Sequence, residues 1–331
     1  MWDSLEESAL AKETEHQLEL MMGASPHIKA EDSVPMIMYT VALALLPSLV
    51  CAIYYFGFRA LALTVVTIVA AMVAEAVIQK LRGQAITIWD GSALVTGLLL
   101  AFNLPPALPY WMAIVGAVVA IFLGKQIFGG LGQNPFNPAL IGRVFLSVAF
   151  PAAMTTWTWP FDGLSLATPY DAFSQATPLM LMKSEGVVTS YLDLFLGNVP
   201  GCLGETCTLA LLVGAGLLLY KRYIDWRIPV GYLGTVFLLT WILGQDPVFH
   251  LLAGGLILGA FFMATDMVTS PMTKTGRWIF GIGAGIILVL IRLYGAYPEG
   301  VSFSILLMNA VTPMLNHYTK PRIFGEVKKH V

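Results

Sequence analysis

Residues 97–103 read GLLLAFN, and residues 259–266 read GAFFMATD. Each stretch is an apolar run that ends on a polar residue, and a proline follows it, at Pro105 in the first case and at Pro271 in the second. A long apolar segment that ends on a cation comes next in both places, with a glycine after the cation. Because glycine, polar residue, proline and cation recur in the same order, we interpret the two stretches as equivalent parts of an internal repeat.

The composition around these stretches indicates a membrane protein. The chain has 331 residues, of which 57% are hydrophobic and 11% are charged, whereas soluble domains are about 25% charged. A bilayer core needs roughly 20 apolar residues per helix. Ten apolar segments are present, at 36–56, 61–81, 91–104, 109–128, 138–153, 206–221, 228–244, 248–265, 277–294 and 300–316. The predicted fold class is therefore an all-α, polytopic membrane protein.

Several of these segments are too short to cross a bilayer. Residues 91–104 would extend only about 21 Å as a helix. Short segments interrupted by glycine and proline are typical of half-helices whose unwound backbone lies inside protein or beside a cavity. Two halves with an odd number of spans are inverted relative to one another. We therefore predict about ten transmembrane helices in two inverted five-helix repeats, with a site between the halves.

Lysine and arginine set the predicted orientation, because cytoplasmic loops are enriched in both. With a cytoplasmic N-terminus, 15 of the 18 cations fall inside. The predicted parts are an acidic cytoplasmic arm (1–33), a first membrane repeat (34–153), an extracytoplasmic loop (154–205), a second membrane repeat (206–318) and a basic cytoplasmic tail (319–331). The net charge of −2 gives no indication of nucleic-acid binding.

The extracytoplasmic loop contains one motif twice, DGLSLATP at 162–169 and DAFSQATP at 171–178. Each copy has an acid and then Ser-x-Ala-Thr-Pro. A threonine hydroxyl flanked by small residues and a nearby acid suits covalent attachment of a phosphate-bearing group. The candidates are Thr168 in the first copy and Thr177, with Asp171, Ser174 and Ala176, in the second. The chemistry of the two copies does not separate them.

Other polar residues lie within or beside the apolar segments. Residues 129–138 read GGLGQNPFNP, which favours a re-entrant loop lining a ligand or ion site over a tight turn, with Asn134 and Asn137 as candidates. Acids inside spans are costly and mark functional sites. Glu75 and Asp266 are the leading ones, and Asn103 ends a broken segment. Alternatively, Glu75 pairs with a buried lysine or arginine.

Cofactor signatures are sparse. The three cysteines lack zinc-type spacing, so we predict no metal site. Cys202 and Cys207 share a loop, and a disulfide between them stays open. A redox role would need a cofactor attached in another way, whereas an inverted-repeat transporter or channel for a small solute would need none. A purely structural subunit is a third interpretation.

The chain resembles a known family. GGLGQNPFNP (129–138), SPHI (25–28), the stretch 196–206 and the Ser-x-Ala-Thr-Pro motif are similar to the D subunit of the Rnf electron-transport complex (RnfD), the counterpart of the B subunit of the Na⁺-translocating NADH:quinone reductase. The resemblance covers residues 24–325. It implies an inner-membrane subunit with FMN in phosphoester linkage to the motif threonine, attached by a flavin transferase. Related subunits also hold a noncovalent riboflavin.

The resemblance also implies a reaction and partners. The chain would belong to a ferredoxin:NAD⁺ oxidoreductase that moves Na⁺ or H⁺ across the lipid bilayer, beside the A, B, C, E and G subunits. It would not be catalytic alone.

The family has one Ser-x-Ala-Thr-Pro motif where this chain has two. The continuation after Thr177, with Leu179 and Lys183, is closer to the family's, so we choose Thr177 over Thr168.

Overall fold

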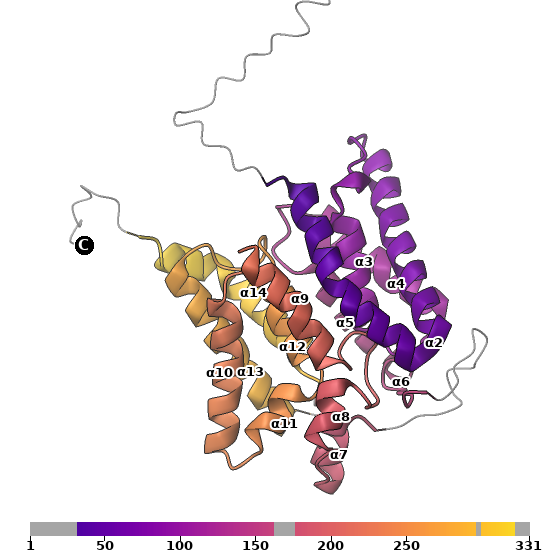
Figure 1. Cartoon of the computed structure of the whole chain (residues 1–331). Helices are drawn as coiled ribbons and strands as arrows, with labels where there is room; N and C mark the ends of the chain where they lie inside the picture. Colours follow the sequence, from indigo (N-terminus) through magenta and orange to yellow (C-terminus); the bar gives the residue numbers. More distant parts are fainter. Residues whose placement is uncertain (1–31, 162–175, 296–298, 322–331) are drawn as a thin grey trace, which may run out of the picture. The chain divides into compact units, whose positions relative to one another are not determined.

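The computed structural model describes residues 32–161, 176–295 and 299–321. Within these ranges the chain is helical and contains no β-strand, which confirms the all-α class (Figure 1). Residues 1–33 and 34–331 form separate units, and every described helix belongs to the second. The two motif positions Asp171 and Ser174, and Thr168 with them, lie outside the described residues.

The longest helix, α2 (Val34–Leu81), consists of two helices joined at a kink. Gly57 occupies the kink with φ 70° and ψ −164°, a conformation that glycine adopts readily because it has no Cβ. The 48 residues of α2 would extend about 70 Å, more than twice the hydrocarbon thickness of a bilayer. The kink divides α2 into two parts that correspond to the segments 36–56 and 61–81.

Shorter helices complete the two halves. After α2 come η1 (Ile88–Asp90), α3 (Ser92–Phe102), α4 (Tyr110–Ile121), the π-helical turn η2 (Phe122–Gln126), α5 (Pro138–Ala149) and α6 (Pro151–Met154). The segment between the two halves contains α7 (Pro178–Glu185) and α8 (Tyr191–Leu196). The second half contains α9 (Thr208–Tyr220), α10 (Arg227–Ile242), α11 (Pro247–Leu252), α12 (Leu256–Leu258), the π-helical turn η3 (Gly259–Met263), α13 (Lys274–Tyr294) and α14 (Val301–Tyr318).

Among the described residues, α2 and α13 are each long and apolar enough to cross a membrane. Shorter apolar helices accompany them, at Ser92–Phe102, Tyr110–Gln126, Pro138–Ala149, Thr208–Tyr220 and Arg227–Ile242. The short elements α3 and α12–η3 lie where the sequence indicates broken helices. The ten-span inverted layout and the limits of the five predicted parts stay predictions.

Buried arginines bind the backbone carbonyls exposed where helices are interrupted. Arg59 of α2 donates hydrogen bonds to the carbonyls of Pro106 (3.1 Å) and Ala107 (3.0 Å), between α3 and α4. Arg292 of α13 donates to the carbonyls of His250 and Ala253, before α12. An unpaired carbonyl inside a membrane protein costs several kcal/mol. These cations therefore stabilise the breaks in both halves.

Small residues allow helices to approach closely, both between the two halves and within the second half, as is common in membrane interiors. A Cβ on Gly214 of α9 would lie 1.9 Å from the carbonyl oxygen of Ala44 in α2. A Cβ on Gly281 of α13 would lie 2.7 Å from the carbonyl oxygen of Ile228 in α10. Helices α10 and α13 accordingly run side by side (Figure 1).

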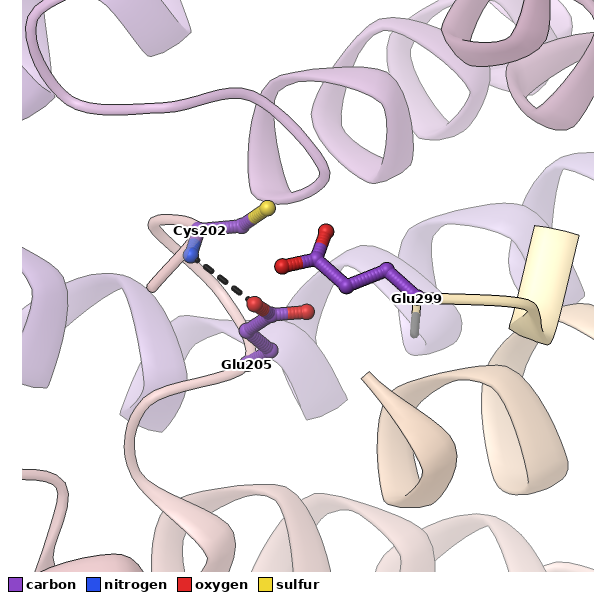
Figure 2. A group of neighbouring side chains, drawn as sticks. All are labelled: Cys202, Glu205 and Glu299. Carbon is purple, nitrogen blue, oxygen red and sulfur yellow. Dashed lines mark hydrogen bonds between the residues drawn. The ribbon is translucent and has the colours of Figure 1, made fainter. Parts of the chain in front are cut away.

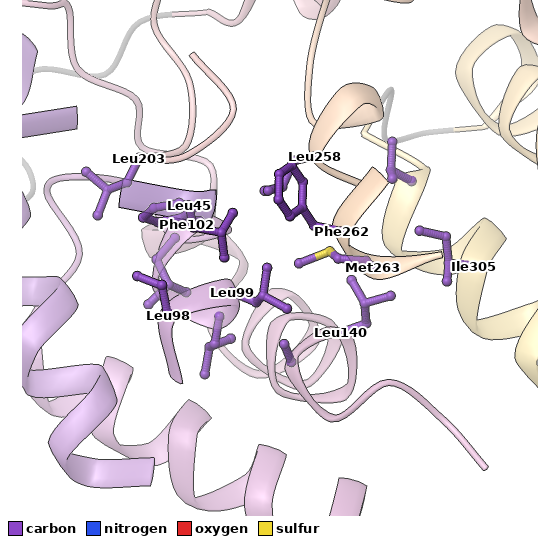
Figure 3. Packing of buried hydrophobic residues seen from close by; sticks show 14 of the residues in the cluster. Leu45, Leu98, Leu99, Phe102, Leu140, Leu203, Leu258, Phe262, Met263 and Ile305 are labelled. Atoms are coloured by element: carbon purple, nitrogen blue, oxygen red, sulfur yellow. The ribbon is translucent and has the colours of Figure 1, made fainter. Parts of the chain in front are cut away.

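The apolar core joins both halves around the ends of the broken helices (Figure 3). Leu99 and Phe102 of α3 and Leu140 of α5 come from the first half, and Met263 and Ile305 come from the second. All five side chains are buried. This packing holds the end of α3 close to the end of η3, and polar side chains on both sides of it form the candidate sites.

Candidate functional site

Thr177 is the N-cap of α7 and is buried. Its Oγ1 accepts a hydrogen bond from the backbone N–H of Met180 at 3.3 Å. Pro178 at the first helical position fixes the backbone where α7 begins. The side chain that the sequence selected therefore lies at a helix N-terminus, where backbone N–H groups point outward and the helix dipole favours negative charge. Ala176 precedes it in irregular backbone.

Thr177 lines a hollow of about 330 Å³, which we call the Thr177 cavity. Its walls come from α7, α8, the segment 199–206, the end of α11 and Glu299. Two acids, Glu205 and Glu299, face it together with Thr206. The Thr206 hydroxyl is buried and has no hydrogen-bond partner among the described residues. The cavity thus combines the hydroxyl of Thr177 with an unused polar group and two carboxyls.

A cluster of charged side chains adjoins the Thr177 cavity, and we call it the Arg143 cluster: Arg143, Cys202, Glu205, Arg292 and Glu299. Figure 2 shows Cys202, Glu205 and Glu299 converging, with ligand-type atoms within 4.8 Å of one another. Arg143 of α5 donates to Glu299 Oε2 at 2.9 Å and to Cys202 Sγ at 3.1 Å. Glu205 Oε1 accepts from the backbone N–H of Cys202 at 3.0 Å (Figure 2).

Burial shifts the pKa values of two residues of the Arg143 cluster, Glu299 and Cys202. Burial, and then the nearby charge of Glu205, raise the pKa of Glu299 to about 7 despite the opposing pull of Arg143 and Arg292. Burial also raises the pKa of the Cys202 thiol well above its ordinary value. Cys202 and Cys207 are both free thiols in the structure. The cluster therefore contains a neutral thiol and a carboxyl that titrates near neutral pH.

A second, larger pocket lies near the end of α9, whereas the Thr177 cavity lies before its start. We call this second pocket, with an empty volume of about 810 Å³, the Lys125 pocket. It is lined by the start of α2, by α3, by the end of α9, and by the loops after η2 and η3. The polar side chains that face it include Lys125, Asn134, Asn137 and Asp266. The structure thus brings together three of the candidates that the sequence had left apart.

Lys125 is paired with the acid that the sequence singled out in α2. Lys125 Nζ lies 2.6 Å from Glu75 Oε1 and also donates to Ser92 Oγ. Gln126 Nε2 donates to the same carboxylate oxygen at 3.0 Å. Both members of the pair are buried. The interpretation of Glu75 as a carboxylate paired with a buried cation is confirmed, and Glu75 does not itself line the Lys125 pocket.

Asn103 and Asn137 connect the two sites through Met263. Asn103 follows α3, and its side chain and backbone accept hydrogen bonds from Arg143. Its Nδ2 also lies 3.6 Å from the sulfur of Met263. On the other side, Asn137 Nδ2 donates to the carbonyl of Met263 at 3.3 Å, and Asn137 Oδ1 caps α5. Polar contacts therefore continue from the Arg143 cluster to the Lys125 pocket.

The sequence marked Lys125 and Arg292 only as the cations of the internal repeat, and it did not single out Arg143, Glu205 or Glu299 as site residues. Lys125 and Arg292 end apolar segments, which is the usual position of a solvated flanking cation. Glu205 and Glu299 lie in connecting segments, where an acid is usually exposed. A signal for Arg143 was available, because it lies only five residues into an apolar segment and a cation within a span is costly unless it has a partner.

Helical breaks, interior ion pairs and two cavities that contain polar groups define an all-helical membrane protein with interior polar sites. The NQR2, RnfD, RnfE family model matches residues 21–325. The chain belongs to this family.

Curated relatives cover nearly the whole chain. It is 50% identical over 317 residues to the D subunit of the Na⁺-translocating ferredoxin:NAD⁺ oxidoreductase complex of Acetobacterium woodii, covering 95% of this chain and 98% of the relative. It is 49% identical to the D subunit of the proton-translocating ferredoxin:NAD⁺ oxidoreductase complex of Clostridium ljungdahlii, covering 92% and 96%. It is 38% identical to the D subunit of the ion-translocating oxidoreductase complex of Escherichia coli, covering 93% and 99%.

Proposed function

We propose that the chain is the D subunit of an ion-translocating ferredoxin:NAD⁺ oxidoreductase and that it carries FMN esterified through its phosphate to Thr177. The observation that carries the first part is identity near 50% over more than nine-tenths of two relatives with that name. Relatives named as oxidoreductase subunits also favour this function over the alternative of a solute transporter. The chain is then a subunit of an enzyme and not a catalyst alone.

The Thr177 cavity supports the attachment site, because its residues fit a phosphate-linked group. Thr177 Oγ1, which accepts the backbone N–H of Met180, would supply the ester oxygen, and the N-terminus of α7 favours the negative charge of a phosphate beside it. Thr206 adds a buried hydroxyl that has no other described partner. When bound, the flavin supplies the electron-transfer chemistry, and the protein contributes position and electrostatics.

The Lys125 pocket supports a second, noncovalent site. It is the larger of the two hollows, and it is enclosed by side chains from several helices and loops. Its walls are mostly apolar, and Asn134 Oδ1 is buried without a partner among the described residues. An apolar pocket with a few polar groups suits a flat ring such as that of riboflavin. Asp266 on its rim is the leading acid for Na⁺ or H⁺.

The remaining features of the proposal follow from the resemblance and the charge pattern. The subunit lies in the inner membrane with both termini cytoplasmic, and its partners are the A, B, C, E and G subunits and a maturing flavin transferase. The loops that line the Lys125 pocket, after η2 and after η3, are expected on the cytoplasmic side. The moved ion stays open, because a Na⁺-translocating and a proton-translocating relative are 50% and 49% identical.

The test is denaturing-gel flavin fluorescence after co-expression of the full chain with a flavin transferase. Thr177→Val should abolish fluorescence, and Thr168→Val should leave it unchanged. Thr177→Ser is the matched control, because it keeps both the hydroxyl and the helix cap. Fluorescence that survives Thr177→Val and disappears with Thr168→Val would assign the ester to the other motif.

A further inference from the structure

The Arg143 cluster contains more ionisable groups than the attachment of a flavin requires. Among the described residues, the charged and titratable groups that face Glu299 come from three elements: Arg143 of α5, Cys202 and Glu205 of the segment before α9, and Arg292 of α13. The groups that α7 and α14 contribute around the same hollows, Thr177, Leu179, Val301 and Ser302, do not titrate. Two acids therefore face two guanidinium groups beside a neutral thiol.

The arrangement disfavours a metal ion, although its three side chains are of ligand type. Arg143 already donates to the Glu299 carboxylate and to the Cys202 sulfur. Glu205 already accepts the backbone N–H of Cys202. A cation bound there would lie beside a guanidinium group that competes for the same atoms, which is unfavourable at short range.

The same arrangement suits one exchangeable proton. Two carboxyls within 4.8 Å of each other in a buried site resist simultaneous ionisation. Arg143 stabilises the ionised form of Glu299 directly, and Arg292 does so from α13, so neither protonation state is strongly excluded. Burial and Glu205 together raise the pKa of Glu299 to about 7. A modest change of charge in the adjoining Thr177 cavity would then change the protonation state of Glu299.

We propose that Glu299 is the redox-linked proton acceptor for the flavin on Thr177, a role that rests on the proposed function. Both Glu299 and Thr177 line the Thr177 cavity. A flavin held at Thr177 would gain one negative charge on two-electron reduction with uptake of one proton. Glu299 takes up a second proton from solvent and cancels that charge, and re-oxidation releases it. The two electrons come from the ferredoxin-class donor of the proposed reaction.

The expected signature is a change of slope in the midpoint potential of the covalent flavin plotted against pH. Below about pH 7, Glu299 holds its proton in both redox states and adds nothing. Above that pH, each pH unit should lower the potential by an additional 30 mV or so, which is the equivalent of a tenfold change for a two-electron couple. The extra slope ends where Glu299 is ionised in both states.

The measurement is spectroelectrochemical titration of the full-length chain, co-expressed with its flavin transferase, between pH 5.5 and 9.5. Subtracting the titration of Thr177→Val removes any noncovalent flavin. Glu299→Gln should lose the additional slope and match the wild type below pH 7. Glu205→Gln should move the change of slope to lower pH, because one of the charges that raise the pKa of Glu299 is gone.

The outcomes separate this inference from the proposed function. If the wild-type chain carries no covalent flavin, the proposed function fails and no slope exists to measure. If it carries the flavin but shows no change of slope, or if Glu299→Gln retains it, the proton role of Glu299 is overturned. Should Glu299→Gln fail to fold, the wild-type profile and the shift in Glu205→Gln decide the question.

Discussion

Lys125, beside its pocket, and Arg143, in its cluster, are each hydrogen-bonded to a buried or half-buried carboxylate, yet the charges around them are balanced differently. Lys125 and Glu75 form a pair of one acid and one base, 2.6 Å apart and supported by the neutral side chains of Gln126 and Ser92. The Arg143 cluster has two acids and two arginines beside a cavity. The first arrangement fixes its charges, and the second leaves one proton adjustable.

The largest expected effect comes from breaking the fixed pair. Lys125→Met should lower the free energy of unfolding in detergent by about 3–5 kcal/mol, because Glu75 would be left buried without a counter-charge. The double variant Glu75→Gln/Lys125→Met should recover most of this loss. Thermal or chemical unfolding with Lys80→Met, an exposed lysine at the end of α2, gives the control. Equal stability of Lys125→Met and Lys80→Met would contradict a structural pair.

A smaller, pH-dependent effect should distinguish the adjustable cluster. The pKa of Glu299 is about 7 in the folded protein and 4.5 in its ordinary state, so the folded state binds the extra proton between these values. Stability should therefore fall as the pH rises from about 4.5 to 7, by on the order of 3 kcal/mol. Unfolding of the flavin-free chain measures this slope. Glu299→Gln should flatten it, and an unchanged slope would refute the assignment.

The smallest predicted effect concerns the connection between the two regions. Asn137→Ala removes the N-cap of α5 and the hydrogen bond to Met263, each worth about 1 kcal/mol. Asn137→Ser should recover the cap alone, so its loss of stability should be roughly half as large. Unfolding of both variants under one condition checks the ratio. An Asn137→Ser variant as stable as the wild type would show that the contact with Met263 contributes nothing, and identical losses in the two variants would show that the cap contributes nothing.

Much of the helical pattern could be predicted from the sequence, because hydropathy and chain breakers act locally. The two segments of α2 are separated by Gly57, and the short helices α3 and α12–η3 lie at the repeated stretches 97–103 and 259–266. The stretch 129–138 contributes Asn134 and Asn137 to the wall of the Lys125 pocket, and its role in a ligand or ion site stays a prediction.

The charged interiors could not be predicted, because their contacts join distant parts of the chain. Arg143 meets Glu299 across 156 residues, and Lys125 meets Glu75 across 50. The charge count treated Arg59, Lys125, Arg143 and Arg292 as loop residues, but all four are buried and say nothing about orientation. The remaining cations are still mostly on the side predicted to be cytoplasmic.

The attachment of a flavin to Thr177 is tested most directly by mass analysis of the full chain produced with its flavin transferase. The account predicts an intact mass greater than that of the residues alone by one FMN less one water, with the addition mapped to a peptide containing Thr177. An intact mass equal to that of the residues, or an addition mapped only to the peptide of Thr168, would contradict it.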